Sequence, residues 1–292
     1  MNYYLCFDVG GTEIKCGYIN TLEEVSEIYH FPAKANGSKD EILNNFIEII
    51  EILINKINGD KTIIGLGLGF PGPFDYENGI SLIKGLNKYE NIYGVNIKYE
   101  LIKKITTSSL EKYFINNCPI KFIHDVKSFA LGIANSQEYS SYKNIFCLAL
   151  GTGVGSAFIS EKQISHVNVP KDGYVHNVPY KNGLIEDYVS TNNLKKISKN
   201  IVGYECDGKM LFDLCNEGNE QALEVYKIFG THIRDSLKDI ILNFNTDLVV
   251  VTGQVVKSFK YFNEVELFCN DNNIGFRIEG NGSFMCLKGL VA

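Results

Sequence analysis

The distribution of apolar residues in the first part of the chain predicts a β-hairpin, a third strand and a long helix. Residues 3–9 form an apolar and aromatic run typical of a strand, and two glycines connect it to a second such run at 14–19. A third strand is expected near 25–31. Between residues 39 and 57 apolar side chains recur at helical spacing, and the Gly-Asp pair at 59–60 is a helix stop.

The rest of the chain repeats this theme and predicts an α/β protein. The segment "TIIGLGLGFPGPFD" is a buried strand that enters a proline–glycine turn, and "IKFIHDVKSFALGIA" is a strand that enters a helix. The segment "NIFCLALGTGVGSAFI" then has the pattern strand, glycine turn, strand, as the opening segment does. A helix is expected over 220–245, and a short strand in "DLVVVTG".

The similarity of the two strand–turn–strand segments predicts two related lobes, and the chain is long enough for two domains. We place the boundary near Asn117, which gives an N-terminal lobe of residues 1–117 and a C-terminal lobe of residues 118–292. Ligands of such proteins commonly bind in the cleft between the lobes, so the active site is expected there.

The first glycine turn has the features of a phosphate-binding loop. Gly10 and Gly11 let the backbone approach a ligand, and their N–H groups can then donate to phosphate oxygens. Thr12 adds a hydroxyl donor, and Lys15 adds a positive charge if its strand faces the site. Asp8 is an anion beside a phosphate site, which is best explained by a divalent cation between the two.

The second turn, Gly151-Thr152-Gly153 followed by Gly155, has Ala149 where the first turn has Asp8. A single Gly-Gly pair between strands is most often only a hairpin turn. Two turns of unequal chemistry, however, fit one nucleotide held from both sides, with a metal ion on one side. Neither segment is a Walker loop or a G-x-G-x-x-G that opens a helix, which argues against the P-loop and Rossmann classes.

Composition and charge indicate an ordinary globular protein without a membrane or nucleic-acid partner. The 292 residues are 45% hydrophobic and 21% charged with a formal net charge of -6, and neither sign forms a long block. No run is long enough to cross a membrane and no signal peptide is recognisable, so we expect a cytoplasmic protein. The eight cysteines are scattered without zinc-site spacing, and we expect reduced core thiols.

In their order and spacing, the motifs resemble those of the ROK family (repressors, open reading frames, kinases) of the actin-like, hexokinase-like ATPase superfamily. "DVGGTEIKCGYI" and "LALGTGVGSAFI" are similar to its two phosphate motifs, "GLGFPGPFDYENG" to its sugar-lobe turn, and "IHDVKSFALG" to its N-D-A-N-A-A-A-L-G segment. "GLIEDYVS" resembles its G-C-L-E-x-Y-x-S, and "VVVTGQVV" its adenosine-side glycine strand. The resemblance covers nearly the whole chain and implies two ribonuclease-H-like lobes with the active-site cleft between them.

The resemblance also implies a role for each matching residue. Asp125 would be the catalytic base that takes a proton from a sugar hydroxyl, and Asp8 would hold Mg²⁺ through water. ATP is implied as the phosphoryl donor. The implied ligand contacts are, for the phosphates, Gly10, Gly11, Thr12, Gly151, Thr152 and Gly153; for the adenosine, Gly253; and for the sugar, Glu186 and Asn87.

Asp125 also has a purely structural explanation. An aspartate at the start of "DVKSFALGIA" is a good helix N-cap, and capping is the simpler reading of this residue alone. Its place between the two phosphate turns favours catalysis instead. A carboxylate beside a sugar hydroxyl can accept the proton, which commonly contributes about 10²–10⁴ in rate.

The chain departs from the family pattern at two places. The family's zinc site uses a G-H histidine and a C-x-C-G-x-x-G-C cluster, but "HVNVPKDGYVHNVPYKNGLIEDYVS" contains no cysteine, so no structural zinc is expected. If "GYVHN" replaces the family's G-E-x-G-H, Tyr174 and Asn177 take the places of the sugar-binding glutamate and histidine; a shifted alignment keeps His176. His124 stands where the family has asparagine, and either touches the sugar's hydroxyls beside Asp125 or only ends a buried strand.

The activity that the resemblance implies is ATP- and magnesium-dependent phosphorylation of a hexose or N-acetylhexosamine at the 6-hydroxyl. The zinc-less, otherwise complete pattern is most similar to the N-acetylmannosamine kinases, with glucokinase or β-glucoside kinase as the alternative. The family also implies a homodimer. The only other partner expected is the small-molecule sugar.

Three functions of other kinds compete with the kinase. A repressor of the family needs a helix-turn-helix domain ahead of the first phosphate motif, whereas seven residues precede Asp8 here. A non-catalytic sugar or nucleotide sensor would commonly lack the base or the metal carboxylate, and this chain has both Asp8 and Asp125. An acyl or activator ATPase of the superfamily would share the phosphate turns without needing the Asp125 segment. We therefore expect an enzyme.

Overall fold

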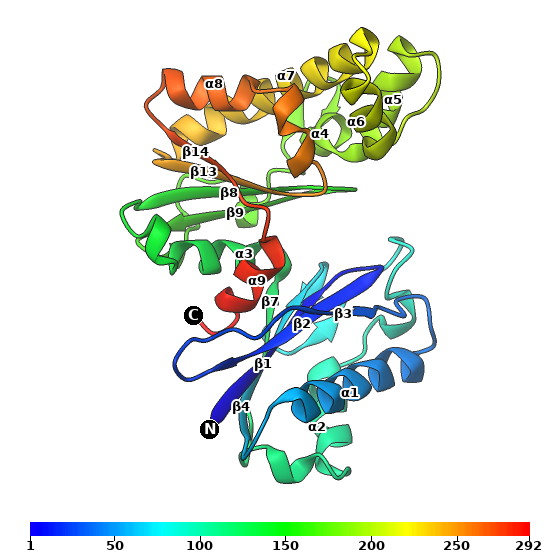
Figure 1. Cartoon of the computed structure of the whole chain (residues 1–292), viewed down its shortest axis with the longest axis vertical. Helices are drawn as coiled ribbons and strands as arrows, with labels where there is room; N and C mark the ends of the chain where they lie inside the picture. The colour runs from blue at the N-terminus through cyan, green and yellow to red at the C-terminus, as the bar shows by residue number, and fades with distance from the viewer. The chain divides into compact units, whose positions relative to one another are not determined.

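The computed structural model describes residues 1–292 and divides into two compact α/β units. Unit 1 consists of Met1–Gly132 with Ser283–Ala292, and unit 2 of Ile133–Gly282. Each unit is built on one five-stranded mixed sheet (Figure 1). This division differs from the boundary predicted near Asn117, because strand β7 (Ile120–His124) pairs with the sheet of unit 1.

The sheet of unit 1 has the order β3-β2-β1-β4-β7. Strands β1 (Asn2–Val9), β2 (Glu13–Asn20) and β3 (Tyr29–Pro32) form an antiparallel meander, and β4 (Thr62–Phe70) joins β1 in parallel. The predicted hairpin is confirmed. The third strand begins later than predicted, since Val25 makes only an isolated bridge to Ile19.

Helix α1 (Lys39–Lys56) confirms the predicted helix and covers one face of this sheet together with α2 (Ile97–Thr106). A capping box starts α1: the Ser38 hydroxyl accepts from the Glu41 N–H, and the Glu41 carboxylate accepts from the Ser38 N–H. The apolar residues at helical spacing, such as Phe46, pack in one core with the strand residue Phe7.

The opposite face of the sheet is covered by α9 (Gly282–Gly289), in a segment to which the sequence assigned no element. Leu287 of α9 packs on Cys6 of β1. Because successive side chains of a strand alternate between its faces, Asp8 lies on the same face of β1 as Cys6. The fold therefore turns the predicted metal carboxylate towards the last helix.

Two glycines allow α9 to lie against α3 (Asp125–Ala134), the helix that directly follows β7. A Cβ atom on Gly132 would overlap the carbonyl oxygen of Met285, and one on Gly289 would overlap that of Ser128. The Ser128 hydroxyl also donates to the Cys286 carbonyl at 2.8 Å. Backbone contact between the helices thus fixes α9 relative to the start of α3.

The sheet of unit 2 repeats the arrangement of unit 1. Its order is β10-β9-β8-β13-β14, with β8 antiparallel to β9 and parallel to β13. This repetition confirms the duplication that the two glycine segments predict. The strands are β8 (Asn144–Leu150), β9 (Val154–Ser160), β10 (Gln163–Ile164), β13 (Leu248–Gly253) and β14 (Gly275–Ile278).

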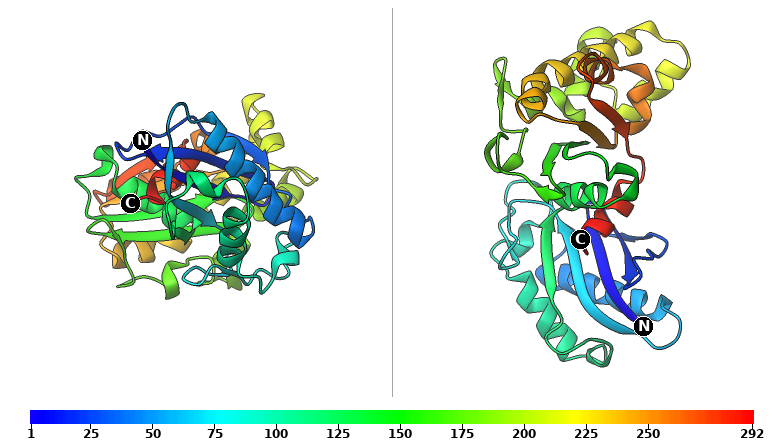
Figure 2. Two further views of the ribbon diagram at one scale, coloured as in Figure 1. Left: turned by 90° about the horizontal axis from the view of Figure 1, so that it is seen from below. Right: turned by 90° about the vertical axis from the view of Figure 1, so that its left-hand side faces the viewer.

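The helices of unit 2 gather on one face of its sheet (Figures 1 and 2). The longest, α7, is capped at its N-terminus by Asn219, whose side-chain oxygen accepts from the Ala222 N–H at 2.9 Å. Its buried stripe, including Phe229 and Leu237, packs in one core with Phe146 of β8. The helices are α4 (Ile185–Val189), α5 (Thr191–Ile201), α6 (Gly208–Asn216), α7 (Glu220–Asn243) and α8 (Glu264–Asp271).

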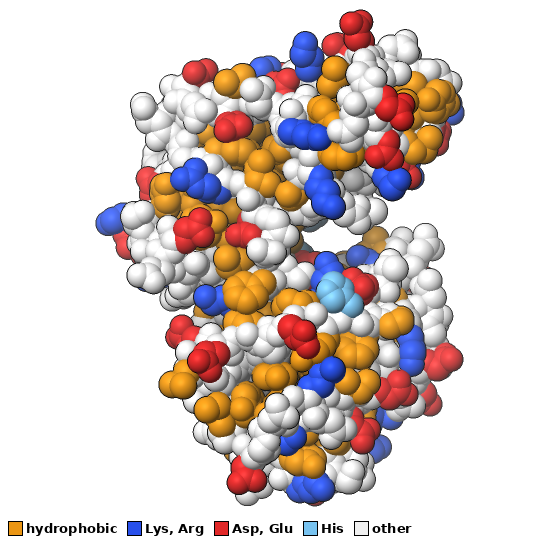
Figure 3. All heavy atoms as spheres, viewed as in Figure 1, with side chains coloured by type: hydrophobic (Ala, Val, Ile, Leu, Met, Phe, Trp, Pro, Cys, Tyr) orange, Lys and Arg blue, Asp and Glu red, His pale blue; other side chains and the backbone are white.

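The remaining elements are short connections. They comprise β5 (Phe74–Asp75), β6 (Ile80–Ser81), β11 (Pro179–Tyr180) and β12 (Gly183–Leu184), with 3-10 turns at Glu90–Ile92, Glu111–Tyr113, Gln137–Tyr139, Lys171–Gly173 and Val256–Tyr261. None of the helices combines the length and apolar character needed to cross a bilayer. Acidic and basic side chains are interspersed on the face of each unit that Figure 3 shows. All eight cysteines are free thiols, and only Cys118 is not fully buried.

Candidate active site

The first glycine turn is shaped by close approach of neighbouring atoms. Gly10 donates its N–H to the Glu13 carbonyl at 2.9 Å, and a Cβ atom on Gly10 would lie 2.7 Å from the same oxygen. A Cβ atom on Gly11 would lie 2.9 Å from Cδ of Lys88. Neither glycine has a positive φ. Lack of room for a side chain, and not backbone conformation, therefore requires glycine at both positions. The carbonyl of the next residue, Thr12, accepts from the Ala33 N–H at 2.9 Å.

Asp8 lies at the end of β1, just before this turn. Its Oδ2 accepts from the Ser283 hydroxyl at 2.6 Å, and Lys15 stands opposite it in the β1–β2 pair. Burial raises the pKa of Asp8; the hydrogen bond from Ser283 and the charge of Lys15 oppose this rise, while the negative charge of Asp125 adds to it. A nearby cation would offset the cost of this buried carboxylate, so Asp8 fits the role of a magnesium ligand.

Asp125 is the first residue of α3, and its side chain is 35% exposed, so a substrate can reach it. Its Oδ1 accepts from the Val126 N–H at 2.8 Å and lies 2.9 Å from Nδ1 of His124. Burial opposes ionisation, but the His124 contact, the Val126 N–H and the charge of Lys88 together hold the pKa of Asp125 below its ordinary value. The group is a carboxylate at neutral pH, as a proton acceptor must be.

His124 occupies the last position of β7 and is 16% exposed. Its imidazole lies beside Gly72, where a Cβ atom would be 3.7 Å from Cδ2, and its ring centroid is 6.0 Å from that of Tyr76. The structure thus brings His124 next to Asp125, as expected from their adjacency in the sequence. The imidazole contacts the carboxylate itself.

Three residues of unit 1 join this site without having been predicted: Ser283, Cys286 and Lys88. The Cys286 thiol lies 3.8 Å from the Asp125 carbonyl, and Gly69 of β4 makes room for it, since a Cβ atom there would be 2.8 Å from Sγ. Burial and the nearby carboxylates raise the pKa of this thiol and so favour its uncharged form. The segment "GSFMCLKG" gives no sequence signal that it packs beside Asp8.

The second glycine turn joins β8 to β9 in unit 2. Gly151 donates its N–H to the Gly153 carbonyl at 3.0 Å, and its own carbonyl accepts from the Thr191 N–H at 2.9 Å. Thr152 lies between them in this tight turn. Gly253 ends β13 opposite Leu150, with φ of 107° and no space for a Cβ atom beside the Leu150 carbonyl. Within unit 2, the fold therefore brings the second glycine turn and the predicted adenosine glycine together.

Glu186, predicted to bind the sugar, lies in the first turn of α4 next to this second glycine turn. Its Oε2 accepts from the Val154 N–H at 3.1 Å and is 3.1 Å from the place of a Cβ atom on Gly153. In the structure, Glu186 therefore supports the shape of the turn. Its contact with a sugar stays a prediction.

The three alternative sugar ligands of the loop before α4 lie near Glu186 in sequence and in space. The His176 carbonyl accepts from the Glu186 N–H at 3.3 Å, and the rings of His176 and Tyr174 are 5.4 Å apart. Asn177 is exposed on the same loop. In unit 1, Asn87 is also exposed and lines a hollow of about 270 Å³ with Ala35, Asn36, Glu90 and Asn91.

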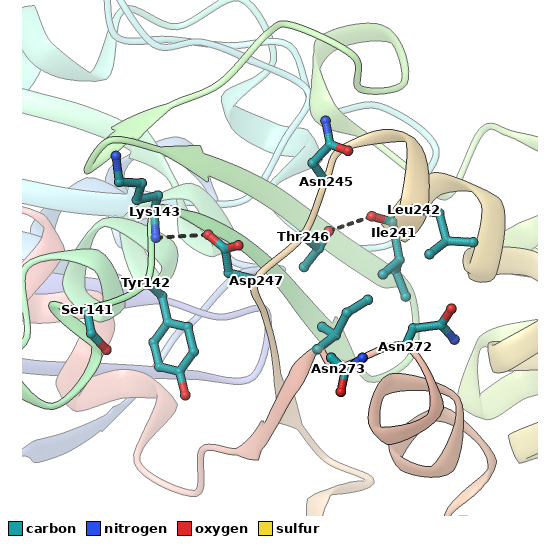
Figure 4. Close-up of a pocket in the computed structure, with 11 residues that line it drawn as sticks. Ser141, Tyr142, Lys143, Ile241, Leu242, Asn245, Thr246, Asp247, Asn272 and Asn273 are labelled. Atoms are coloured by element: carbon teal, nitrogen blue, oxygen red, sulfur yellow. Dashed lines mark hydrogen bonds between the residues drawn. The ribbon is translucent and has the colours of Figure 1, made fainter.

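A second hollow, of about 660 Å³, lies in unit 2 away from these residues (Figure 4). It is lined at the beginnings of β8 and β13, whereas the glycine turns follow the ends of these strands. Asp247 there accepts from the Asn144 N–H at 2.8 Å and is already satisfied. No three histidine, cysteine, aspartate or glutamate side chains gather as a metal-binding group. The absence of zinc stays a prediction.

Known proteins share both the sequence pattern and the fold. The ROK family profile matches residues 4–272. An N-acetyl-D-glucosamine kinase of Haemophilus influenzae is 22% identical over 283 residues, which cover 89% of this chain and 86% of that protein. The crystal structure of a ROK family glucokinase from Streptomyces griseus with glucose and AMPPNP covers 99% of this chain and 97% of its own, with a TM-score of 0.72 and 14% identity.

A putative N-acetylmannosamine kinase from Listeria monocytogenes has a similar fold, with a TM-score of 0.74 at 16% identity over 99% of this chain and 97% of that one. The two structural neighbours establish the actin-like ATPase fold expected from the sequence. The profile match spans nearly the whole chain, including both glycine turns and the Asp125 segment. The chain therefore belongs to the ROK family.

Proposed function

We propose that this protein is an ATP-dependent sugar kinase that phosphorylates a hexose or N-acetylhexosamine at its 6-hydroxyl. The observation that carries the proposal is the arrangement in unit 1, where Asp8 and Asp125 both lie beside Gly69 of β4. Gly69 pairs with Asp8, and the place of a Cβ atom on Gly69 is 3.6 Å from Cα of Asp125, while β1 leads from Asp8 directly into the Gly10–Gly11 turn. Membership of the ROK family and the names of its similar proteins support the same reaction.

The proposed reaction transfers one phosphoryl group. Asp125 accepts the proton of the sugar hydroxyl, and the hydroxyl oxygen forms a bond to the terminal phosphorus of ATP as the bond to the ADP oxygen breaks. In unit 1 the N–H groups of Gly11 and Thr12 would donate to phosphate oxygens beside Gly10, whose own N–H is bonded to the Glu13 carbonyl. In unit 2 the Gly151–Gly153 turn and Gly253 would bind the nucleotide. Mg²⁺, held by Asp8 through water, would neutralise phosphate charge.

For the sugar, we propose N-acetylmannosamine. The fold neighbour named as a putative N-acetylmannosamine kinase and the missing zinc cysteines support this choice, while glucokinase or β-glucoside kinase activity is the alternative. Contacts to the sugar are proposed for Asn87, His124 and Glu186, with Tyr174 and Asn177 or His176 completing the site. We also propose that the protein is cytoplasmic and forms a homodimer. Light scattering on the purified protein would check the dimer.

The experiment that tests the function is a coupled assay of ADP release by purified protein with ATP and Mg²⁺. Glucose, mannose, N-acetylglucosamine, N-acetylmannosamine and a β-glucoside are offered separately. Turnover highest with N-acetylmannosamine supports the full proposal, and turnover highest with another sugar corrects only the substrate. Absence of turnover with all five contradicts the kinase and favours a sugar or nucleotide sensor.

Replacing the base tests the mechanism. Asp125→Asn retains an oxygen that can accept the Val126 N–H but cannot take the sugar proton. We expect sugar-dependent ADP release to fall by about 10² or more, with ATP binding retained. The measurement is kcat in the coupled assay, with nucleotide affinity measured by calorimetry. Turnover near that of the unmodified protein would remove Asp125 from the reaction.

A further inference from the structure

Lys88 lies against the first phosphate turn, although the sequence offered Lys15 as the cation of that site. The Lys88 side chain runs over Gly11: its Cδ, Cβ and Cγ atoms are 2.9, 3.6 and 3.9 Å from the place of a Cβ atom on that glycine. A side chain on residue 11 would push the lysine aside. The absence of one at Gly11 thus makes room for Lys88 as well as for a phosphate.

The backbone on both sides of Lys88 is held in a strained conformation. Asn87 and Tyr89 have φ of 54° and 55°, in the left-handed region that residues other than glycine seldom adopt. Tyr89 is fully buried and fixes the segment, since its hydroxyl donates to the Gly10 carbonyl at 3.0 Å and its N–H to the Ala35 carbonyl at 2.8 Å. A buried tyrosine thus ties the neighbour of Lys88 to the phosphate turn itself.

The Lys88 ammonium group has no ion-pair partner within the protein. It takes part in none of the salt bridges or hydrogen bonds of the chain, in contrast to Lys34 and Lys39, which pair with Glu48 and Glu100. Its charge is nevertheless one of the influences that lower the pKa of Asp125. The stem of Lys88 thus lies on the phosphate turn, and the donors of its ammonium group are available to a ligand.

We propose that Lys88 is a further catalytic residue, whose ammonium group binds the phosphoryl group during its transfer from nucleotide to sugar. The inference rests on the proposed kinase function. The transferred group has to pass between the nucleotide bound at the Gly10–Gly11 turn and the hydroxyl that Asp125 deprotonates, and Lys88 lies against the turn at which this path begins. A fixed cation there stabilises the negative charge on the phosphoryl oxygens as one P–O bond breaks and the other forms.

The test compares Lys88→Met with Lys88→Arg and the matched control Lys84→Met. Methionine keeps an unbranched apolar stem over Gly11 and removes the charge. Lys84 belongs to the same segment, is exposed, and has its ammonium group over the Tyr93 ring at 5.7 Å. We expect Lys88→Met to lower kcat by about 10²–10³ with little change in KM for the sugar. Lys88→Arg should retain part of the activity, and Lys84→Met all of it.

Binding measurements separate catalysis from a structural role. With N-acetylmannosamine and its 6-phosphate as probes, or the sugar that the assay identifies and its 6-phosphate, Lys88→Met should weaken binding of the phosphorylated sugar by about tenfold or more. Affinity for the free sugar should stay unchanged. The thermal midpoint should remain within about 2 °C of the unmodified protein.

The outcomes distinguish the two proposals. If the unmodified protein is active and Lys88→Met matches Lys84→Met in kcat and in binding of the sugar phosphate, Lys88 has no role in transfer and the kinase proposal stands. If Lys88→Met loses affinity for the free sugar as much as for its phosphate, the lysine acts on the shape of the site, and the inference is overturned. If the unmodified protein turns over no sugar, the kinase proposal fails and the role of Lys88 with it.

Discussion

At the scale of single residues, the two carboxylates of unit 1 have opposite electrostatic settings. Burial raises the pKa of Asp8, whereas the contacts with His124 and the Val126 N–H, together with the charge of Lys88, outweigh burial and lower the pKa of Asp125. The base is therefore ready to accept a proton, and the other carboxylate is held at a cost that a bound cation would relieve. Divergent pKa shifts in neighbouring acids commonly mark a division of roles.

Asp8→Asn should stabilise the protein in buffer without divalent cations. A raised pKa in the folded state means that the stability this group provides is complete below its ordinary value of 3.8 and is lost as the pH rises through the folded-state value. At neutral pH the ionised Asp8 is thus a net cost, which asparagine removes while still accepting from Ser283. We expect a thermal midpoint higher by about 2–4 °C for each kcal/mol relieved.

Thermal melts of Asp8→Asn would be repeated at about pH 5. The rise in thermal midpoint should be smaller there, because Asp8 of the unmodified protein is protonated to a greater extent. The exposed Asp271→Asn is the matched control and should show no gain at either pH. Addition of Mg²⁺ with ATP should stabilise the unmodified protein more than Asp8→Asn. An asparagine variant that melts at a lower temperature than the unmodified protein at neutral pH would contradict this account of Asp8.

At the scale of elements, the contact between α3 and α9 positions the residues around Asp8 and Asp125. Gly132 and Gly289 permit backbone contact between these helices, and α9 carries Ser283 to Asp8 and Cys286 to the Asp125 carbonyl. Alanine is normally the better helix former by about 0.5–1 kcal/mol. At Gly132 and Gly289, however, the overlap of an added methyl group with the facing backbone should outweigh the higher helix propensity of alanine.

Gly132→Ala should destabilise the protein by about 1–3 kcal/mol and lower sugar kinase activity, because the new methyl group overlaps the Met285 carbonyl and displaces α9. Urea unfolding measures the change. Gly208→Ala is the matched control: Gly208 starts α6 without a positive φ, and nothing lies within 4 Å of its added Cβ. This control should be neutral or gain up to about 1 kcal/mol. If Gly132→Ala and Gly208→Ala have the same free energy of unfolding, the close backbone contact between α3 and α9 does not contribute to stability as proposed.

The sequence predicted the elements that have a strong local signal. The hairpins with their glycine turns, α1 with its regular apolar spacing, and α7 were all found, because each is specified by neighbouring residues. The short helix α9 was missed, since eight residues give little periodicity. Its packing depends on Gly132, which is far away in the chain. Local patterns do not reveal such contacts.

The same distinction explains the candidate site. Asp8, Asp125 and the glycines belong to contiguous motifs, so their chemistry could be recognised. Lys88 and Ser283 come near them only through tertiary structure: Tyr89 ties the Lys88 segment to Gly10, and α9 brings Ser283 to Asp8. The boundary near Asn117 was placed by the repeat of motifs, whereas the pairing of β7 with β4 decides where unit 1 continues.

At the scale of the whole molecule, the charge distribution predicts no affinity for nucleic acid. The formal net charge is -6, and basic side chains are mixed with acidic ones on the surface shown in Figure 3. Fluorescence anisotropy of a labelled duplex of about 30 base pairs, at roughly 50 mM salt, should show no saturable binding at about 10 μM protein. Binding that weakens steeply with added salt would reveal a cationic surface and contradict this expectation.

The return of Ser283–Ala292 to unit 1 also bears on how the protein is made. During translation, the ribosome completes all of unit 2 before it delivers the helix that covers Cys6 and reaches Asp8. Until then, α9 does not cover its face of the unit 1 sheet in the nascent chain. Synthesis of this late segment, and not of residues 1–132 alone, therefore completes the proposed metal side of the site.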